Sequence, residues 1–410
     1  MLLKKFIRVG VLISIIFSQT TQAQERHFLV VSDAHLARGI PHVMNFKPSR
    51  VSVWNDLDKS SLQLLMASIA DNIKKGMIPK PNFILYLGDM VGHVRLVNHS
   101  VWDTETDFFR TFAELFPGTS LLYTFGNNDS FQKNYGAFSI IDTDGVHKTP
   151  LSAAFATGQW RNDFISIGKA CQQSLTELPC MISQNTRQGY YSAYLEPGLR
   201  LISLNSVIFA NNVHSEGANN ELEWLKTQLQ LGKINKESIL LIMHIPPGKG
   251  VDDNKFYWKP EINQIFLKLV EAYQDVIIGM LAGHTHMDEI KIIQNSSQQP
   301  LAGIYLTPSL STSHGNAPAI RSYSYEKQGS KWQLIDYTTY FFEKTTEASV
   351  HLKKLYTYRE EYCTQSEKNM TQCLNRVTAS KMQQFYFAGN NAFPQKIAAP
   401  ENMRAICYDE

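Results

Sequence analysis

The segment "DVIIGMLAGHTH", residues 275–286, joins a run of apolar residues to two histidines that stand one residue apart. A short run of β-branched and other apolar residues is typical of a buried β-strand. His284 and His286 therefore follow directly on a predicted strand, behind Gly283. One such pair is a weak indication of a binding site, so its meaning depends on what ends the other predicted strands.

Five further segments share this character. Each is short, rich in β-branched and aromatic residues, and typical of a strand; they are HFLVVSD (27–33), FILYLGD (83–89), LLYTFGN (121–127), LRLISLN (199–205) and SILLIMH (238–244). In two intervening segments, 60–75 and 260–274, apolar residues recur every three or four positions, as on one face of a helix. A third helix is expected after a cap at Asn219 or Asn220. The alternation predicts an α/β fold of packed layers.

The later part of the chain has a different pattern. Residues 304–311, 321–326 and 331–342 are typical of strands, and KQGSK (327–331) is typical of a hairpin turn. From about residue 345 the sequence becomes polar and is expected to be helical. We therefore predict a main domain over residues 24–344 and a small helical region over 345–410.

Side chains of metal-binding type end five of the predicted strands. They are Asp33, His35, Asp89, Asn127, His244, His284 and His286. Ligand sites in α/β folds gather at the carboxyl ends of strands, so these side chains are expected to meet. Each has a structural alternative: the aspartates can cap helices, and Asn127 can occupy a left-handed turn. Independent structural residues, however, have no reason to share this position relative to a strand.

This set suits two divalent cations better than one. Imidazole and carboxylate ligands favour zinc, with iron or manganese as alternatives. Two cations held by two carboxylates keep a positive charge that can bind phosphate. Paired metal ions can also activate a bridging water, whose lowered pKa makes hydroxide available near neutral pH for in-line attack. The pattern therefore predicts a dinuclear metal site for a phosphorylated substrate.

The motifs DxH, GD, GNxD, MH and GHTH follow one another in an order that resembles calcineurin-like metallophosphoesterases. The segments GDMVGH (88–93), 189–206, HIPPG (244–248) and 307–326 further resemble the acid sphingomyelinase-like phosphodiesterase branch. The resemblance runs from about residue 27 to 410. It implies two packed mixed β-sheets flanked by helices, a four-layer sandwich. It also implies one metal ion bound by Asp33, His35, Asp89 and His286, and a second bound by Asp89, Asn127, His244 and His284.

One position departs from the family pattern. Many relatives have a histidine after the GN of GNxD, where this chain has Asn128. An amide can donate a hydrogen bond to a phosphate, but it cannot supply a proton. His93, four residues after Asp89, is then the candidate general acid, the alternative being that it only binds phosphate. His314 is a further candidate for binding the substrate.

The N-terminus is typical of a signal peptide. Lys4, Lys5 and Arg8 precede the apolar residues 9–17, and cleavage after Ala23 is expected. The alternative is a buried strand or an anchor, but the apolar run is too short to span a bilayer, so no stable membrane anchor is expected. Export predicts a secreted or periplasmic protein in which disulfides persist. The near pairs Cys171/Cys180 and Cys363/Cys373 are the natural candidates, and the odd cysteine must stay free or pair between chains.

The balance of charged residues indicates which kinds of partner the chain is expected to bind. The chain has 39 Lys and Arg against 37 Asp and Glu, so it lacks the basic excess of a protein that binds a nucleic-acid duplex. We expect an exported phosphodiesterase for small phosphodiesters or phosphoanhydrides of nucleotide or choline type. The alternatives are an endopolyphosphatase or nucleotide pyrophosphohydrolase, prompted by Asn128, and a non-catalytic protein that binds a phosphorylated ligand.

Overall fold

The computed structural model describes residues 25–37, 56–93, 101–130, 134–141, 144–145, 147–148, 170–171, 175, 177–210, 217–252, 254–312, 314–346, 349–388, 399–403 and 406–407. The predicted signal peptide, residues 1–23, lies outside the described residues.

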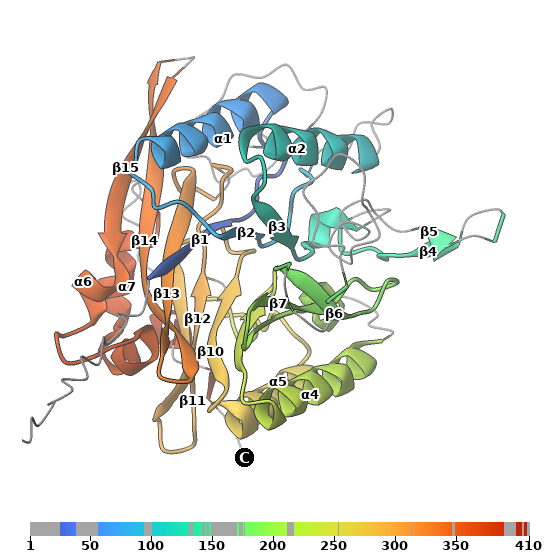
Figure 1. Ribbon diagram of the computed structural model, residues 1–410, viewed down its shortest axis with the longest axis vertical. Coiled ribbons are helices and arrows are strands. Elements are labelled where there is room, and N and C mark those ends of the chain that lie inside the picture. The colour runs from blue at the N-terminus through green and yellow to red at the C-terminus, as the bar shows by residue number, and fades with distance from the viewer. Residues whose placement is uncertain are drawn as a thin grey trace, which may run out of the picture.

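Two mixed β-sheets form the centre of the molecule, which confirms the expected sandwich (Figure 1). The first sheet has the order β15-β14-β13-β1-β2-β3. Its strands are β1 (Arg26–Val31), β2 (Phe83–Tyr86), β3 (Ser120–Tyr123), β13 (Ala319–Gln328), β14 (Lys331–Thr346) and β15 (Ser349–Thr357). The predicted turn at 327–331 is confirmed, because Gln328 pairs with Lys331 across Gly329, whose φ is +64°.

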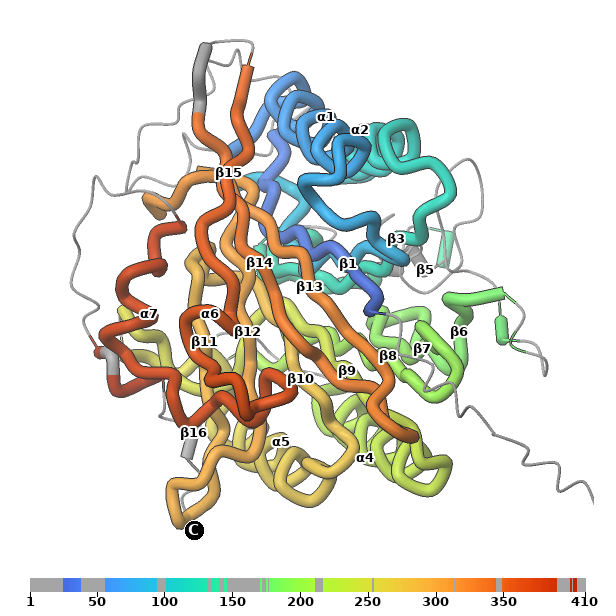
Figure 2. Tube along the Cα trace, turned by 60° about the vertical axis from the view of Figure 1, so that its left-hand side comes forward, coloured from blue at the N-terminus to red at the C-terminus, as the bar shows by residue number. Residues whose placement is uncertain are grey.

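The second sheet has the order β16-β11-β12-β10-β9-β8-β7-β6. Its strands are β6 (Cys180–Gln184), β7 (Tyr191–Glu196), β8 (Leu199–Ser203), β9 (Ser238–Ile242), β10 (Ile277–Ala282), β11 (Glu289–Gln294), β12 (Pro300–Leu306) and β16 (Ile406–Cys407). Apart from the sandwich, β4 (Ile140–Ile141) and β5 (His147–Lys148) form a small hairpin. The β13–β14 hairpin crosses β9 and β10, so the two sheets pack face to face (Figure 2).

Helices cover the outer faces of both sheets (Figure 1). α1 (Lys59–Lys74) and α2 (Val101–Leu115) lie against the first sheet, and α4 (Ala218–Ile234) and α5 (Pro260–Tyr273) lie against the second. The expected periodicity is confirmed in α1, which buries Leu62, Leu65, Met66 and Ile69. The expected cap of α4 is wrong: the helix begins earlier, after Gly217, whose φ of +99° an asparagine would adopt less readily.

The C-terminal region is only partly helical, which corrects the expectation of helix from residue 345. Residues 349–357 form β15, an edge strand paired with β14. Its apolar residues Leu352 and Tyr356 face the core, whereas Lys353 and Lys354 are exposed. Helical structure follows in α6 (Tyr358–Tyr362), η4 (Met370–Arg376), α7 (Ala379–Phe385) and η5 (Pro400–Met403). The segment η4 contacts both β12 and β14, so this region joins the two sheets.

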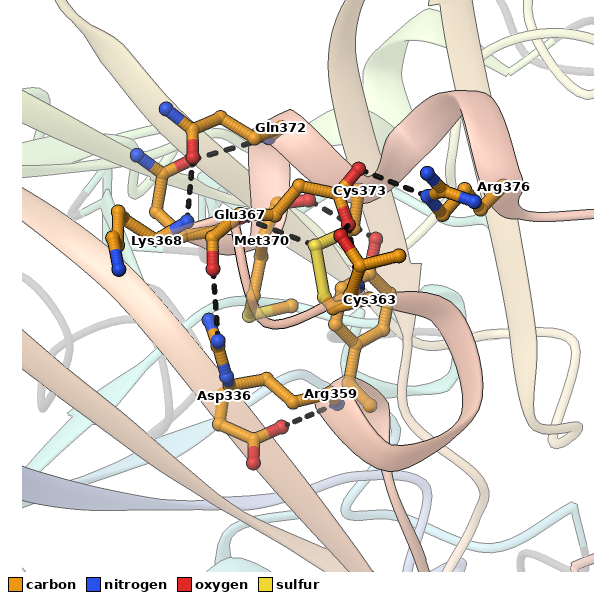
Figure 3. The surroundings of a disulfide bond; sticks show 12 residues. Asp336, Arg359, Cys363, Glu367, Lys368, Met370, Gln372, Cys373 and Arg376 are labelled. Carbon is orange, nitrogen blue, oxygen red and sulfur yellow. Dashed lines mark hydrogen bonds and ion pairs between the residues drawn. A yellow bond between two sulfur atoms is a disulfide. The ribbon is translucent and has the colours of Figure 1, made fainter.

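Both predicted disulfides are confirmed, Cys171–Cys180 and Cys363–Cys373. The second joins the end of α6 to η4 (Figure 3). Beside it, Arg359 donates through its backbone N–H to Asp336 at 2.9 Å and through its guanidinium to the Glu367 carbonyl at 2.8 Å. The side chain of Cys407 lies outside the described residues.

The free energy of unfolding of the double variant Cys363→Ser/Cys373→Ser is expected to be about 2–3 kcal/mol lower than that of the parent protein. The disulfide closes a loop of sequence separation 10, and its loss returns conformational freedom to the unfolded chain. Urea unfolding of both proteins measures the difference. Activity is expected to be unchanged. Equal midpoints for the two proteins would contradict the prediction.

Candidate metal centre

The carboxyl ends of the parallel strands from both sheets meet at one place. In the first sheet β1, β2 and β3 are parallel, and in the second β8, β9, β10 and β12 are parallel. The loops that follow these strands are hydrogen-bonded to one another. Asp33 N–H donates to Gly88 O at 3.0 Å, and His284 N–H donates to the Asp33 carboxylate at 3.1 Å. Side chains far apart in the sequence are thereby brought together.

All seven predicted ligands lie in this place, in two neighbouring clusters. The first contains Asp33, His35 and His286, and the second contains Asp89, His244 and His284. In the first, His35 Nε2 and His286 Nε2 are 3.0 Å apart. In the second, His244 Nε2 is 3.1 Å from Asn127 Oδ1, which adds the amide to the cluster.

Asp89 lies between the two clusters. Its Oδ2 is 3.5 Å from His35 Nε2 and 3.4 Å from His244 Nε2. A carboxylate in this position can serve both clusters at once. This is the arrangement expected of a bridging ligand between paired metal ions.

The geometry fits divalent cations. Asp33 Oδ1 is buried and makes no hydrogen bond within the described part of the chain. It faces the Nε2 atoms of His35, His286 and His244 at 3.7, 3.5 and 3.9 Å. Ligand atoms about 2.0 Å from a tetrahedral ion stand about 3.3 Å apart, close to these separations. A cation here would provide the partner that the buried oxygen lacks.

The backbone is strained around the ligands. Asp33, His35, Asp89, His284 and His286 all have positive φ, between 46° and 74°. Non-glycine residues rarely adopt this conformation, and clusters of such residues mark functional sites. Gly126 has an ordinary φ, but a Cβ there would stand 2.0 Å from Asp89 Oδ1. The loops are thus shaped to bring the ligands close together.

The electrostatics favour neutral His284 and His286, and a protonated His244, beside an ionised Asp89. Burial alone would raise the pKa of Asp89, but His244 and His35 hold it well below its usual range. Burial would lower the pKa of His244, yet Asp89 and Asp33 raise it to about 9. Burial, reinforced by the charge of His244, lowers the pKa of His284 to about 4, and burial with His314 lowers that of His286 well below 6.5. Neutral imidazoles offer the lone pairs that a metal requires.

His244 shows how an imidazole is oriented. Its Nδ1 donates to the carbonyl of Leu87 at 2.7 Å, which leaves the Nε2 lone pair directed at the cluster. Gly88 allows this approach, because a Cβ there would lie 2.8 Å from His244 Nδ1.

Asp129 is a site residue to which the sequence reasoning gave no role. Its carboxylate accepts hydrogen bonds from the backbone N–H groups of Asp89, Met90, Val91 and Gly126 at 2.7–3.2 Å. It also accepts from the Tyr123 hydroxyl at 2.5 Å. Asp129 therefore fixes the loop of Asp89 against the loop of Asn127. Its place within GNND was the only signal available.

Two of the three other predicted site residues, His93 and His314, lie at the edge of this centre. The His93 ring stacks on the His35 ring, 4.3 Å between centroids, and the His314 ring meets His286 edge-on at 4.7 Å. His93 is partly exposed and His314 is exposed. Asn128 is instead buried: it donates to Asp89 through its backbone N–H at 2.7 Å and its side-chain amide at 2.8 Å. These two hydrogen bonds hold Asp89 in place. The expected role of Asn128 in substrate binding remains a prediction.

The fold and this centre define a phosphoesterase class. The family model of calcineurin-like phosphoesterases matches residues 26–288, and the chain belongs to this family. Among curated proteins, the chain is 25% identical over 312 residues to a cyclic GMP-AMP phosphodiesterase, SMPDL3A, of Bos taurus, covering 71% of this chain and 63% of that protein. It is 26% identical over 362 residues to sphingomyelin phosphodiesterase 2 of Caenorhabditis elegans, covering 80% and 53%. It therefore lies in the acid sphingomyelinase-like branch, and it spans about three fifths of the length of these relatives.

A solved structure of a dimetal phosphatase from Danio rerio covers 80% of this chain and 98% of its own, with 10% identity and a TM-score of 0.42. In the part of the chain that the structure describes, none of the helices combines the length and apolar character needed to cross a membrane.

Proposed function

We propose that this chain is an exported phosphodiesterase that uses two divalent metal ions to hydrolyse small phosphodiesters or phosphoanhydrides. The position of Asp89 between two ligand clusters is the observation that carries this proposal. When bound, the two ions would bind phosphoryl oxygens and lower the pKa of water, which supplies the nucleophile. Zinc is the preferred ion on the basis of the histidines, with iron or manganese as alternatives.

The residues of the chain divide the remaining work. Asp33, His35, Asp89 and His286 would hold one ion, and Asp89, Asn127, His244 and His284 the other. The partly exposed His93 and the exposed His314 lie on the side that a substrate can reach. His93 donates a proton to the departing oxygen, and His314 contacts the substrate. Asn128 keeps Asp89 in its bridging position and contributes to binding the developing charge.

The substrate class follows from the relatives. Those in the same branch are named for a cyclic dinucleotide and for sphingomyelin, a choline-containing diester. We therefore propose nucleotide or choline-type diesters. Export is supported by the two disulfides, which persist in oxidising compartments. A phosphoanhydride substrate, as for an endopolyphosphatase or nucleotide pyrophosphohydrolase, is the second candidate, favoured by Asn128 in place of histidine.

The first test compares bis-p-nitrophenyl phosphate with p-nitrophenyl phosphate, using metal-loaded protein and His244→Ala as the blank. The diester is expected to be cleaved faster than the monoester, and the blank is expected to be inactive. Equal rates for parent and blank on both esters would contradict the proposed phosphodiesterase activity. Release of phosphate from polyphosphate would then favour the second candidate.

His93→Ala is expected to slow hydrolysis most where the leaving group is a poor one. Protonation by a general acid contributes about 10²–10⁴-fold when the departing oxygen is strongly basic, and little when it is stable as an anion. Rates for a series of aryl methyl phosphodiesters, from p-nitrophenol to phenol as leaving group, measure this. A uniform loss across the series would show that His93 only binds phosphate.

A further inference from the structure

Asp56 lies beside the centre, in a place that no motif indicates. Its side chain is buried, with 1% exposed, and it contacts His93 twice. Asp56 Oδ1 is 2.8 Å from His93 Nδ1, and Asp56 Oδ2 accepts the His93 backbone N–H at 2.6 Å. Because a carboxylate only accepts hydrogen bonds, His93 Nδ1 carries the proton in this contact. The remaining ring nitrogen, Nε2, is then the one left for a substrate.

Backbone hydrogen bonds already fix the segment that carries Asp56. Leu57 N–H donates to His35 O at 2.9 Å, and Ala37 N–H donates to Leu57 O at 2.8 Å. On the other side of the same loop, Gly92 N–H donates to Leu36 O at 2.9 Å. The three loop segments therefore lie side by side through their main chains. The Asp56 carboxylate adds its two hydrogen bonds with His93 to this contact between main chains.

The neighbouring residue is suited to this contact. A Cβ on Gly92 would stand 2.6 Å from Asp56 Oδ2 and 3.0 Å from His35 O. Only a glycine lets the chain before His93 approach the carboxylate so closely. The contact between Asp56 and His93 thus depends on three features: a buried acid, a glycine, and a histidine with two donors.

We propose that Asp56 is the positioning residue of the proposed general acid: it holds the His93 ring in one orientation and one tautomer against His35. The inference rests on the proposed function. A carboxylate that fixes the tautomer and the orientation of an acid–base histidine is a recurring device in hydrolases. The planes of the stacked His93 and His35 rings differ by 10°. This stacking then sets the distance between the proposed acid and the first cluster.

The same carboxylate also lies near a metal ligand. Asp56 Oδ1 is 3.9 Å from His35 Nδ1, a buried nitrogen that makes no hydrogen bond within the described residues. The nitrogen on the other side of the His35 ring faces the first cluster. Asp56 is therefore shared between the proposed acid and a ligand, and a small loss of metal affinity, about 10-fold, is expected when its charge is removed.

The test compares Asp56→Asn, His93→Ala and the double variant on the series of aryl methyl phosphodiesters, with saturating metal. An amide offers one acceptor where His93 presents two donors, so the ring loses its fixed orientation. For Asp56→Asn we expect a loss of about 10–100-fold with phenol as leaving group and less than about 3-fold with p-nitrophenol. The p-nitrophenyl rate also reports that the variant is folded and metal-loaded.

Asp58→Asn is the matched control. Asp58 is two residues away and caps α1 through Ser61 N–H at 2.6 Å, and it belongs to neither ligand cluster. It is expected to keep the parent's dependence on the leaving group. In the His93→Ala background, Asp56→Asn is expected to add no further dependence, because two residues that act as one unit are not additive.

The outcomes separate this inference from the proposed function. A selective loss in both single variants, without additivity, supports the positioning role. A selective loss in His93→Ala with a uniform change in Asp56→Asn overturns the inference and leaves the proposed acid in place. No selectivity in His93→Ala overturns the acid and, with it, the role of Asp56.

Discussion

Asp89→Asn is expected to lower phosphodiester hydrolysis by about 10³-fold or more, since metal ions contribute several kcal/mol to the stabilisation of transition-state charge. The change preserves the size of the side chain and removes its negative charge. It also removes an acceptor, because both Asp89 oxygens accept hydrogen bonds from Asn128. A single oxygen of Asp89, Oδ2, lies within 3.5 Å of histidine Nε2 atoms in both clusters, so its replacement should disturb both metal sites.

Metal content gives a readout that is independent of activity. The parent protein is expected to bind two divalent ions per chain, and Asp89→Asn fewer than two at the same free metal concentration. Asp71→Asn is the matched control, because this side chain is 59% exposed on α1 and belongs to neither ligand cluster. An Asp89→Asn protein with both ions and near-parental turnover would contradict the bridging role.

Arg321→Met is expected to lower the free energy of unfolding by about 3–5 kcal/mol, because it leaves a buried carboxylate without its cation. Arg321, in β13 of the first sheet, is fully buried and bonded to Asp288, which precedes β11 of the second sheet. Its guanidinium also lies 4.3 Å from the centre of the Tyr337 ring. After the substitution, Asp288 would keep the hydroxyls of Tyr356 at 2.7 Å and Thr339 at 3.1 Å, which carry no positive charge.

Lys353→Met is the matched control for this buried pair. Lys353 and Glu343 form an ion pair of 2.7 Å between β15 and β14, but both side chains are 49% exposed. Solvent screens such a pair, so its loss is expected to cost no more than about 1 kcal/mol. Urea unfolding at a fixed metal concentration compares the two variants. Adding Asp288→Asn to Arg321→Met should restore part of the loss. Similar small losses for both single variants would show that the buried pair is not needed.

The positions of the predicted ligands could be predicted from the sequence because two patterns agree. Each of these residues ends an apolar strand, and the parallel strands bring such ends to one edge of each sheet. His244 and Asp89 are 155 residues apart in number, yet both follow the same kind of run. Their assignment to particular metal ions came from the family resemblance and remains a proposal.

Asp56 and Asp129 were not predicted because their roles depend on contacts between loops. Asp129 accepts hydrogen bonds from backbone groups about forty positions earlier, and Asp56 meets His93 across 37 positions. No local periodicity records such a contact. The missed strand β15 has a different cause. Edge strands commonly carry exposed lysines, and Lys353 and Lys354 gave this one the polar character of a surface helix.

The order of strands in the first sheet has a consequence for how the protein is made. β1 is the first described strand along the chain, yet its neighbour on one side, β13, begins at Ala319. A ribosome that adds about 5–20 residues per second needs roughly 15–60 s to cover the distance between them. During that time one edge of β1 lacks its partner strand β13 and is exposed to pairing with other chains. Productive folding of this protein is therefore expected to depend on protection of its N-terminal half until synthesis is almost complete.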